Sequence, residues 1–192
     1  MSILTATPVP LARIHKPYLM SKLLLSILFC FPLTLLSQST LLKPQLELLN
    51  TKVDKIEATH YLLNEPADKN FDSKFKVLEF WATWCRPCLK AVPHLNKLQA
   101  KFKDSTIVFL SFTYESPQKA AEAFRKVNFE TVVVTDTARA IHKKLRIDMN
   151  GTMPLPRTVL IDNENRIVWY GSPEKLTAKL IQRFLRKEPI AD

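Results

Sequence analysis

EFWATWCRPC, from Glu79 to Cys88, is the stretch that decides the fold of this 192-residue chain. The residues that lead into it, 76–81, are apolar or aromatic almost without a break, which predicts a buried strand. After Cys85, apolar side chains recur at helical spacing as far as Phe102, which predicts a helix with one inward face. Both cysteines therefore fall in the first turn of a helix that follows directly on a buried strand.

The spacing of Cys85 and Cys88 indicates a redox-active disulfide. One thiol lies at the N-terminus of the predicted helix and the other lies one turn further in, so a reversible disulfide is geometrically easy. The helix dipole and the free N–H groups at that end stabilise an anion, so we expect a lowered thiol pKa and a nucleophilic role for Cys85. Arg86 adds a cation beside the same thiolate. Cys88 is expected to be the resolving thiol, which attacks the mixed disulfide formed on Cys85.

Glu79 interrupts the apolar run shortly before the cysteines. A carboxyl group in the low dielectric of a buried strand has a raised pKa, which suits it to exchange protons near neutral pH. Cys88 must lose a proton before it can attack, so we assign Glu79 to that proton transfer. The alternative, that Glu79 faces solvent on an edge strand, stays open at this point.

A structural zinc site is the main alternative for the cysteine pair. Such a site needs two further Cys or His ligands at suitable spacing. Cys30 lies in a separate apolar segment, and His60, His94 and His142 form no pair. We expect His94 to be a surface or partly packed residue rather than a catalytic base. The sequence therefore predicts neither a metal nor a cofactor.

The composition excludes two further classes of function. With only two glycines, the chain cannot build a glycine-rich phosphate loop, so nucleotide chemistry is not expected. The net charge of +10 is spread along the chain, and residues 40–192 hold 25 basic and 18 acidic residues. Most lysines alternate with acidic and apolar residues, which is typical of solvated helix faces, so we expect no nucleic-acid partner.

Residues 1–39 have the pattern of an export signal. The uncharged apolar run 23–36 is too short to span a bilayer comfortably, Lys22 precedes it, and small residues favour cleavage after Ser39. Met20 is an alternative start. Lipid attachment at Cys30 is disfavoured because Phe29 precedes it, where a small residue is usual. We therefore expect an exported, periplasmic or extracytoplasmic protein that has no stable membrane span once the signal is cleaved, and that is tethered to the membrane if it is not.

A single domain is expected at residues 75–188, after a lead-in segment at 40–74. Downstream of the cysteines, predicted strands and helices alternate, which indicates a parallel section of sheet. A polar turn at 163–165 then indicates an antiparallel hairpin. The elements expected there are strands at 106–112, 131–134, 157–162 and 166–170, and helices from 116, at 138–145 and at 174–186.

The segment from Glu79 to Cys88 resembles the active-site segment of the thioredoxin superfamily, especially its exported TlpA-like and ResA-like disulfide reductases. The resemblance covers residues 75–186. Pro93 falls where thioredoxins have a helix proline, and Glu79 falls where they carry a buried acid. The resemblance implies an α/β thioredoxin fold, with a central mixed β-sheet flanked by α-helices on both faces.

The resemblance also implies a substrate-binding surface. Pro156 matches the cis-proline that faces the cysteines, and Leu155 would offer backbone groups to an incoming substrate strand. Further substrate contacts are implied for the neighbours of the cysteines, Trp84, Arg86 and Pro87. Two positions depart from the family pattern, because Ala91 replaces a ResA-like glutamate and Arg157 replaces the usual threonine.

The function expected is dithiol–disulfide exchange with disulfide-bearing protein substrates outside the cytosol, in the reducing direction. That direction requires an upstream membrane or periplasmic thiol donor. One alternative is a thiol peroxidase, although Ala82 stands where peroxiredoxins carry a threonine. Another is a non-catalytic binding module that presents Trp81 and Trp84 to a partner. The physiological substrate, the donor and the oligomeric state are not determined by the sequence.

Overall fold

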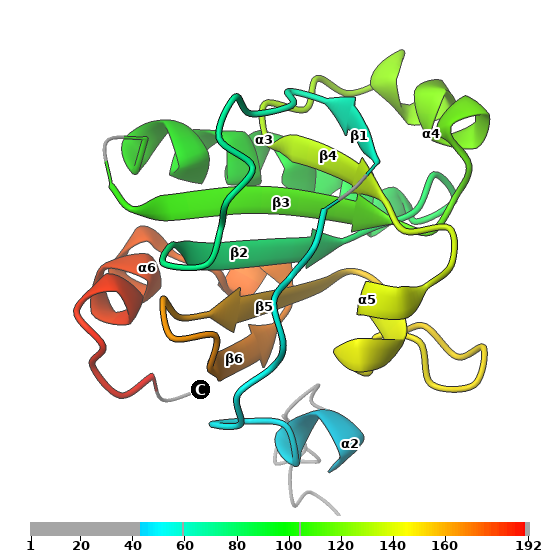
Figure 1. Cartoon of the computed structure of the whole chain (residues 1–192). Helices are drawn as coiled ribbons and strands as arrows, with labels where there is room; N and C mark the ends of the chain where they lie inside the picture. The colour runs from blue at the N-terminus through cyan, green and yellow to red at the C-terminus, as the bar shows by residue number, and fades with distance from the viewer. Residues whose placement is uncertain (1–42, 59, 104, 191–192) are drawn as a thin grey trace, which may run out of the picture. The chain divides into compact units, whose positions relative to one another are not determined.

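A six-stranded mixed sheet forms the centre of the computed structural model, which describes residues 43–58, 60–103 and 105–190 (Figure 1). The expected signal segment, with Cys30 and the cleavage site after Ser39, lies outside the described residues. The strands are β1 Tyr61–Leu63, β2 Phe75–Phe80, β3 Ile107–Thr113, β4 Val132–Thr135, β5 Arg157–Ile161 and β6 Ile167–Gly171. The helices are α2 Lys43–Leu46, α3 Arg86–Lys101, α4 Pro117–Phe124, α5 Ala140–Lys144, the 3-10 turn η1 Pro173–Lys175 and α6 Ala178–Leu185.

The strand order is β1-β4-β3-β2-β5-β6. Strands β2, β3 and β4 are parallel, whereas β5 runs antiparallel to β2, β6 antiparallel to β5, and β1 antiparallel to β4. The mixed sheet expected from the sequence is therefore confirmed. Strand β2 lies inside the sheet with a partner on each side, so Glu79 cannot face solvent from an edge strand.

The side chains of β2 alternate between the two faces of the sheet. Val77 packs in a cluster with α3 and α6, and Trp81, just after the strand, packs with the cysteines and α4. Leu78 and Phe80 instead pack with residues of α5 and of the lead-in segment. Helices α3, α4 and α6 thus cover one face of the sheet, and α5 covers the other.

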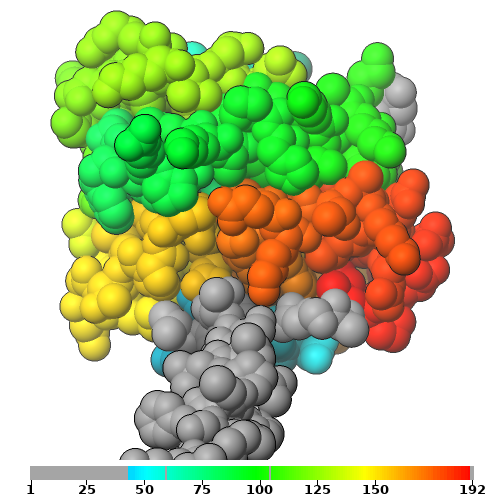
Figure 2. All heavy atoms as spheres, turned by 180° about the vertical axis from the view of Figure 1, so that it is seen from behind, coloured from blue at the N-terminus to red at the C-terminus, as the bar shows by residue number. Residues whose placement is uncertain are grey.

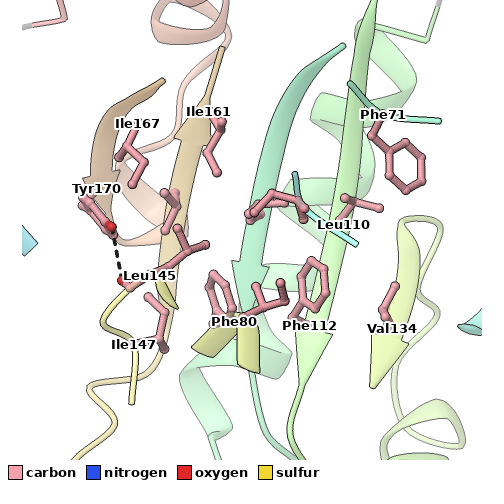
Figure 3. Close-up of a cluster of buried hydrophobic side chains, with 14 residues drawn as sticks. Phe71, Phe80, Leu110, Phe112, Val134, Leu145, Ile147, Ile161, Ile167 and Tyr170 are labelled. Carbon is pink, nitrogen blue, oxygen red and sulfur yellow. Dashed lines mark hydrogen bonds between the residues drawn. The ribbon is translucent and has the colours of Figure 1, made fainter. Parts of the chain in front are cut away.

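The α5 face holds a large apolar cluster, drawn in Figure 3. Its side chains come from both the parallel and the antiparallel parts of the sheet, and the Tyr170 hydroxyl donates to the Leu145 carbonyl at 3.2 Å. The cluster packs against the α5 side of β2 and β5, of which β2 leads to the cysteines and β5 follows Pro156. Its core members include Leu78, Phe80, Leu110, Phe112, Leu145, Ile147, Val159, Ile161, Ile167 and Tyr170.

The last helix differs from the prediction. A continuous helix was expected at 174–186, but the chain makes a separate 3-10 turn, η1, before α6 begins at Ala178. The Thr177 side chain accepts the Leu180 N–H and so caps α6. A threonine in extended conformation is a favourable N-cap, so it starts a new helix rather than continuing one. Residue Leu176 between the two pieces is buried.

The lead-in segment contributes to the sheet. β1 comes from it and pairs with β4, and Ile56 is buried in the apolar cluster of the α5 face. At the other edge, a Cβ on Gly171 would lie 2.1 Å from a ring atom of Trp169, so β6 has no space for a side chain there. No helix within the described ranges is both long enough and apolar enough to cross a bilayer.

Candidate active site

Cys85 and Cys88 form a disulfide across the first turn of α3, with their Cα atoms 5.3 Å apart. Cys85 is the N-cap residue of the helix, and the Cys88 N–H points at its sulfur at 3.3 Å. The Cys88 sulfur lies 4.0 Å from the carbonyl oxygen of Phe80, at the end of β2. A helix N-terminus favours negative charge, so a thiolate on Cys85 would occupy a position already prepared for an anion.

Exposure does not distinguish the two cysteines. The exposed fraction is 3% for Cys85 and 2% for Cys88, so capping geometry rather than accessibility separates their roles. Trp84 is in contrast 59% exposed, and Arg86 and Pro87 are exposed beside it. The exposed side chains next to the disulfide thus include one aromatic ring and one cation.

Glu79 is buried, with 4% of its surface exposed. Its Oε2 accepts a 2.5 Å hydrogen bond from the Thr158 hydroxyl, a residue of β5 directly opposite in register. Its Oε1 is buried and receives no hydrogen bond within the described part of the chain. Because side chains alternate along a strand, Glu79 lies on the face of β2 that α3 covers, between Val77 and Trp81.

Burial raises the pKa of the Glu79 carboxyl well above its ordinary value. The hydrogen bond from Thr158 opposes this shift, Glu174 adds to it through like charge, and Arg157 opposes it as a cation. Desolvation is the largest of these effects, because a buried carboxylate loses its hydration. The structure therefore places a carboxyl with a raised pKa on the same side of the sheet as the cysteine helix.

Two residues at the end of β3 hold the loop before the cysteines. Glu115 accepts the Thr83 N–H at 2.6 Å on one carboxylate oxygen and the Thr83 hydroxyl at 2.8 Å on the other. The Tyr114 hydroxyl accepts the indole N–H of Trp84 at 2.9 Å. Sequence reasoning missed both contacts. The sequence could have indicated them, because Tyr114 and Glu115 directly follow β3. The carboxyl ends of the parallel strands β2 and β3 meet at one edge of the sheet, where functional groups gather.

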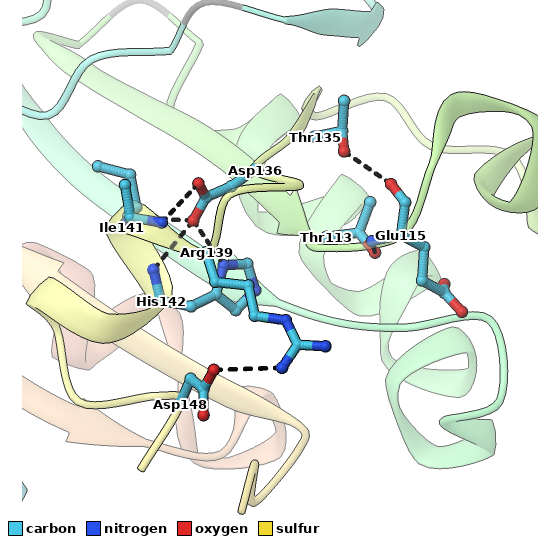
Figure 4. A network of polar contacts seen from close by, with 9 residues as sticks. Thr113, Glu115, Thr135, Asp136, Arg139, Ile141, His142 and Asp148 are labelled. Carbon is cyan, nitrogen blue, oxygen red and sulfur yellow. Dashed lines mark hydrogen bonds and ion pairs between the residues drawn. The ribbon is translucent and has the colours of Figure 1, made fainter. Parts of the chain in front are cut away.

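A polar network lies between the end of β3 and α5, where the Thr135 hydroxyl donates to the Glu115 carbonyl at 2.7 Å (Figure 4). Asp136 accepts the Nδ1 of His142 at 2.8 Å and three N–H groups of the first turn of α5. Burial opposes ionisation of Asp136, but these hydrogen bonds outweigh it and lower its pKa. The fully buried ring of His142 packs between the rings of Phe80 and Tyr114. The network thus connects the capped helix α5 to the residues beside the cysteines.

Arg139 joins the same network from its surface side. Its guanidinium lies 4.6 Å from the centre of the Tyr114 ring and pairs with Asp148 at 3.3 Å. A cation over a tyrosine face is attracted to the ring. Tyr114 is therefore held from two sides, by Arg139 and by Trp84.

The Leu155–Pro156 peptide bond is cis. The Leu155 side chain packs against the cluster that contains both cysteines and Trp81, which brings this loop beside the disulfide. The Leu155 N–H, however, donates to the Met153 carbonyl at 3.0 Å. A substrate strand would have to open this local bond to use that donor. Arg157 is buried opposite Phe80 in the β2–β5 register.

The described residues contain no group of three or more His, Cys, Asp or Glu side chains arranged to hold a metal ion. His94, which was expected to be a surface or partly packed residue, is half-buried, and its Nε2 lies 2.8 Å from the Leu176 carbonyl oxygen. It connects α3 to the segment before α6.

A family model described as Redoxin matches residues 63–180, which is more than half of the chain. The chain belongs to the Redoxin family. The match runs from the end of β1 into α6 and contains the cysteines, Glu79 and the cis-proline loop.

Two relatives of known name are thiol-disulfide oxidoreductases. Thiol-disulfide oxidoreductase ResA of Bacillus thuringiensis subsp. konkukian (strain 97-27) is 28% identical over 120 residues, covering 62% of this chain and 66% of that protein. ResA of Bacillus subtilis (strain 168) is 30% identical over 120 residues, covering 58% and 63%. The chain thus spans just under two thirds of these relatives.

The fold also has solved counterparts. A thiol:disulfide interchange protein of the thioredoxin family from Chlorobium tepidum TLS matches with a TM-score of 0.55 and 16% identity, over 67% of this chain and 92% of that one. At this identity the similarity concerns the fold alone. The α/β thioredoxin fold expected from the sequence is confirmed.

Proposed function

We propose that this chain is a thiol–disulfide oxidoreductase that exchanges its Cys85–Cys88 pair with disulfides of protein substrates. The observation that carries the proposal is the disulfide across the first turn of α3, with the Cys88 N–H directed at the Cys85 sulfur. The names of the ResA relatives support the same activity. No cofactor takes part in this chemistry, because the electrons reside in the two thiols.

In the reducing direction the reaction begins with both cysteines as thiols. The Cys85 thiolate attacks one sulfur of the substrate disulfide, which forms a mixed disulfide and releases one substrate thiolate. Cys88 loses its proton and attacks the Cys85 sulfur. The internal disulfide forms, the second substrate thiolate leaves, and two electrons have passed to the substrate.

Glu79 is proposed to accept the proton of Cys88. Its carboxyl lies on the face of β2 covered by α3, and the Cys88 sulfur rests against the backbone of the next residue, Phe80. Burial brings the pKa of the carboxyl closer to the pKa of a thiol, which lowers the free-energy cost of proton transfer from Cys88. The buried Oε1, which has no hydrogen bond within the described residues, is the oxygen that would take the proton.

The substrate is proposed to lie over Trp84, Arg86 and Pro87, with Leu155 and Pro156 on the other side of the disulfide. Support comes from the exposure of the first three residues and from the packing of Leu155 against the cysteine cluster. Trp84 is the only one of these with a large exposed apolar surface, and its orientation is fixed by Tyr114.

Export and direction belong to the same proposal. Residues 1–39 carry the signal pattern, with Met20 as an alternative start, and the lead-in 40–74 precedes the thioredoxin-like domain at 75–188. Outside the cytosol disulfides persist, so a reductase there depends on an upstream membrane or periplasmic thiol donor. A reduction potential far more oxidising than the value of about −270 mV for thioredoxin would contradict the reducing direction.

The experiment that tests the exchange is Cys88→Ser. Without the resolving thiol, Cys85 is expected to stay linked to its substrates as stable mixed disulfides, which mass spectrometry identifies after non-reducing electrophoresis of the purified variant. Adducts are expected to disappear on addition of dithiothreitol.

Cys85→Ser is the matched control, because it keeps one cysteine of the pair but removes the nucleophile. It is expected to accumulate few adducts. The proposal is wrong if Cys88→Ser forms no adduct while alkylation shows that its Cys85 thiol is free and reactive.

A further inference from the structure

The exposed face of α3 carries positive charge only. Its charged residues are Arg86, Lys90, Lys97 and Lys101, and all four are exposed. At 3.6 residues per turn they fall within about 60° of the helix circumference and extend for about 22 Å along it. We call these four residues the α3 basic face. Figure 2 shows the side of the molecule on which α3 lies, above the segment that contains η1.

The four side chains of the α3 basic face lack ion-pair partners in the part of the chain that the structure describes. None of the ion pairs within residues 43–58, 60–103 and 105–190 includes one of its four side chains. In two other helices some cations are paired: Lys119 of α4 pairs with Glu122 at 2.9 Å, and Arg183 of α6 pairs with Glu188. The helix that carries the disulfide therefore presents a row of four cations that form no ion pair within the described residues.

Helix stability does not account for the charges nearest the cysteines. Cations stabilise the C-terminus of a helix and are unfavourable at its N-terminus, where the dipole is positive. Lys97 and Lys101 have the favourable position, but Arg86 is the first helical residue, Lys90 is one turn later, and the first turn has no acidic residue. The α3 basic face thus reaches the disulfide although helix electrostatics oppose it there.

Glu130 and Glu174 lie on segments that contact α3, but they do not neutralise its charge. On one side, Gln99 of α3 donates to the Glu130 backbone carbonyl at 2.6 Å, and on the other His94 contacts the segment that follows η1, which carries Glu174. Both glutamates are exposed, and neither forms an ion pair with the α3 basic face in the described residues.

We propose that the α3 basic face is a docking surface for protein substrates that carry acidic residues next to their disulfide. Because this assignment rests on the exchange reaction proposed above, the partner must contain a disulfide, which excludes nucleic acid and lipid as the occupant. Acidic side chains would be attracted along α3 toward Cys85, which the face reaches at Arg86. Attraction of this kind acts mainly on the association rate and is screened by salt.

The test compares two disulfide peptides that differ only in charge. One has glutamates and the other glutamines on both sides of the same single disulfide. The full chain is reduced with dithiothreitol, freed of it, and mixed with each peptide while tryptophan fluorescence follows formation of the Cys85–Cys88 disulfide. At low salt we expect the glutamate peptide to react faster on the order of tenfold, and the ratio to approach one in about 0.5 M salt.

Charge reversal locates the effect. The double variant Lys90→Glu, Lys97→Glu is expected to bring the ratio of the two rate constants to one or below. The matched control is Lys43→Glu, Lys52→Glu, which changes the net charge equally at two exposed lysines outside α3. The control is expected to keep the wild-type ratio.

Three outcomes would contradict the proposed docking surface. The wild type reacts with both peptides at equal rates, the ratio of the two rate constants persists in the α3 double variant, or the control variant loses this ratio to the same extent. The proposal is also wrong if single-stranded DNA or anionic vesicles bind the protein more tightly than the glutamate peptide does and this binding depends on Lys90 and Lys97. In each case the glutamine peptide is still reduced, whereas a protein that reduces neither peptide refutes the proposed function itself.

Discussion

Replacement of Glu79 by Gln is expected to change how the stability of the protein depends on pH. In the folded protein, burial raises the pKa of this carboxyl well above its ordinary value, whereas in the unfolded chain it is about 4.3. The folded state therefore keeps a proton that the unfolded state releases. The stability that this provides is fully present below about pH 4.3 and is lost as the pH rises toward the folded pKa.

The magnitude follows from linkage. Between the unfolded and the folded pKa, the wild type loses about 1.4 kcal/mol of unfolding free energy per pH unit through this one group. Glutamine cannot titrate, and its side-chain carbonyl can still accept the Thr158 hydroxyl that now donates to Glu79. The unfolding free energy of Glu79→Gln minus that of the wild type should therefore rise with this slope and level off at the folded pKa.

The assay is urea unfolding of the oxidised protein at closely spaced values between about pH 5 and pH 8, followed by tryptophan fluorescence. Glu57→Gln is the matched control, because Glu57 is exposed and keeps its hydration on folding. Its curve is expected to run parallel to that of the wild type. If the Glu79→Gln curve is also parallel to the wild type, burial does not raise the pKa of the carboxyl toward that of a thiol, and the proposed proton transfer loses its physical basis.

Three further predictions test particular contacts. Thr158→Val removes the hydroxyl that lowers the pKa of Glu79, so in the same titration the pH-dependent loss of stability should extend to higher pH, and an unchanged range would contradict the assigned hydrogen bond. Glu115→Gln takes the charged acceptor from the two Thr83 donors and should lower the unfolding free energy by about 1–3 kcal/mol, measured in urea, with a near-zero change as the refuting result. Gly171→Ala should cost about 1–3 kcal/mol because its Cβ would overlap the neighbouring indole ring, and thermal unfolding of equal midpoint would show that the ring moves freely.

Much of the fold was accessible from local patterns. The run from residue 76 to the cysteines predicted β2 and α3, and the helical spacing after Cys85 predicted the buried face that α3 presents to the sheet. The alternation of strands and helices, with a hairpin at its end, predicted a mixed sheet. These features depend on residues close in sequence, so periodicity and spacing are sufficient to identify them. The boundary between η1 and α6 was missed, because a single capping threonine outweighed a continuous apolar pattern.

The chemistry of the cysteine pair was likewise a property of the sequence, since two residues between thiols at a helix N-terminus define both the disulfide and the capped nucleophile. The environment of Glu79 was decided only by tertiary structure. Its hydroxyl donor, Thr158, is 79 positions away and meets it because β5 crosses over to pair with β2 in one particular register. The same holds for Glu115 on Thr83, from the neighbouring strand, and for the lack of ion pairs on the α3 basic face within the described residues. Such contacts are set by strand order and register, which no local pattern encodes.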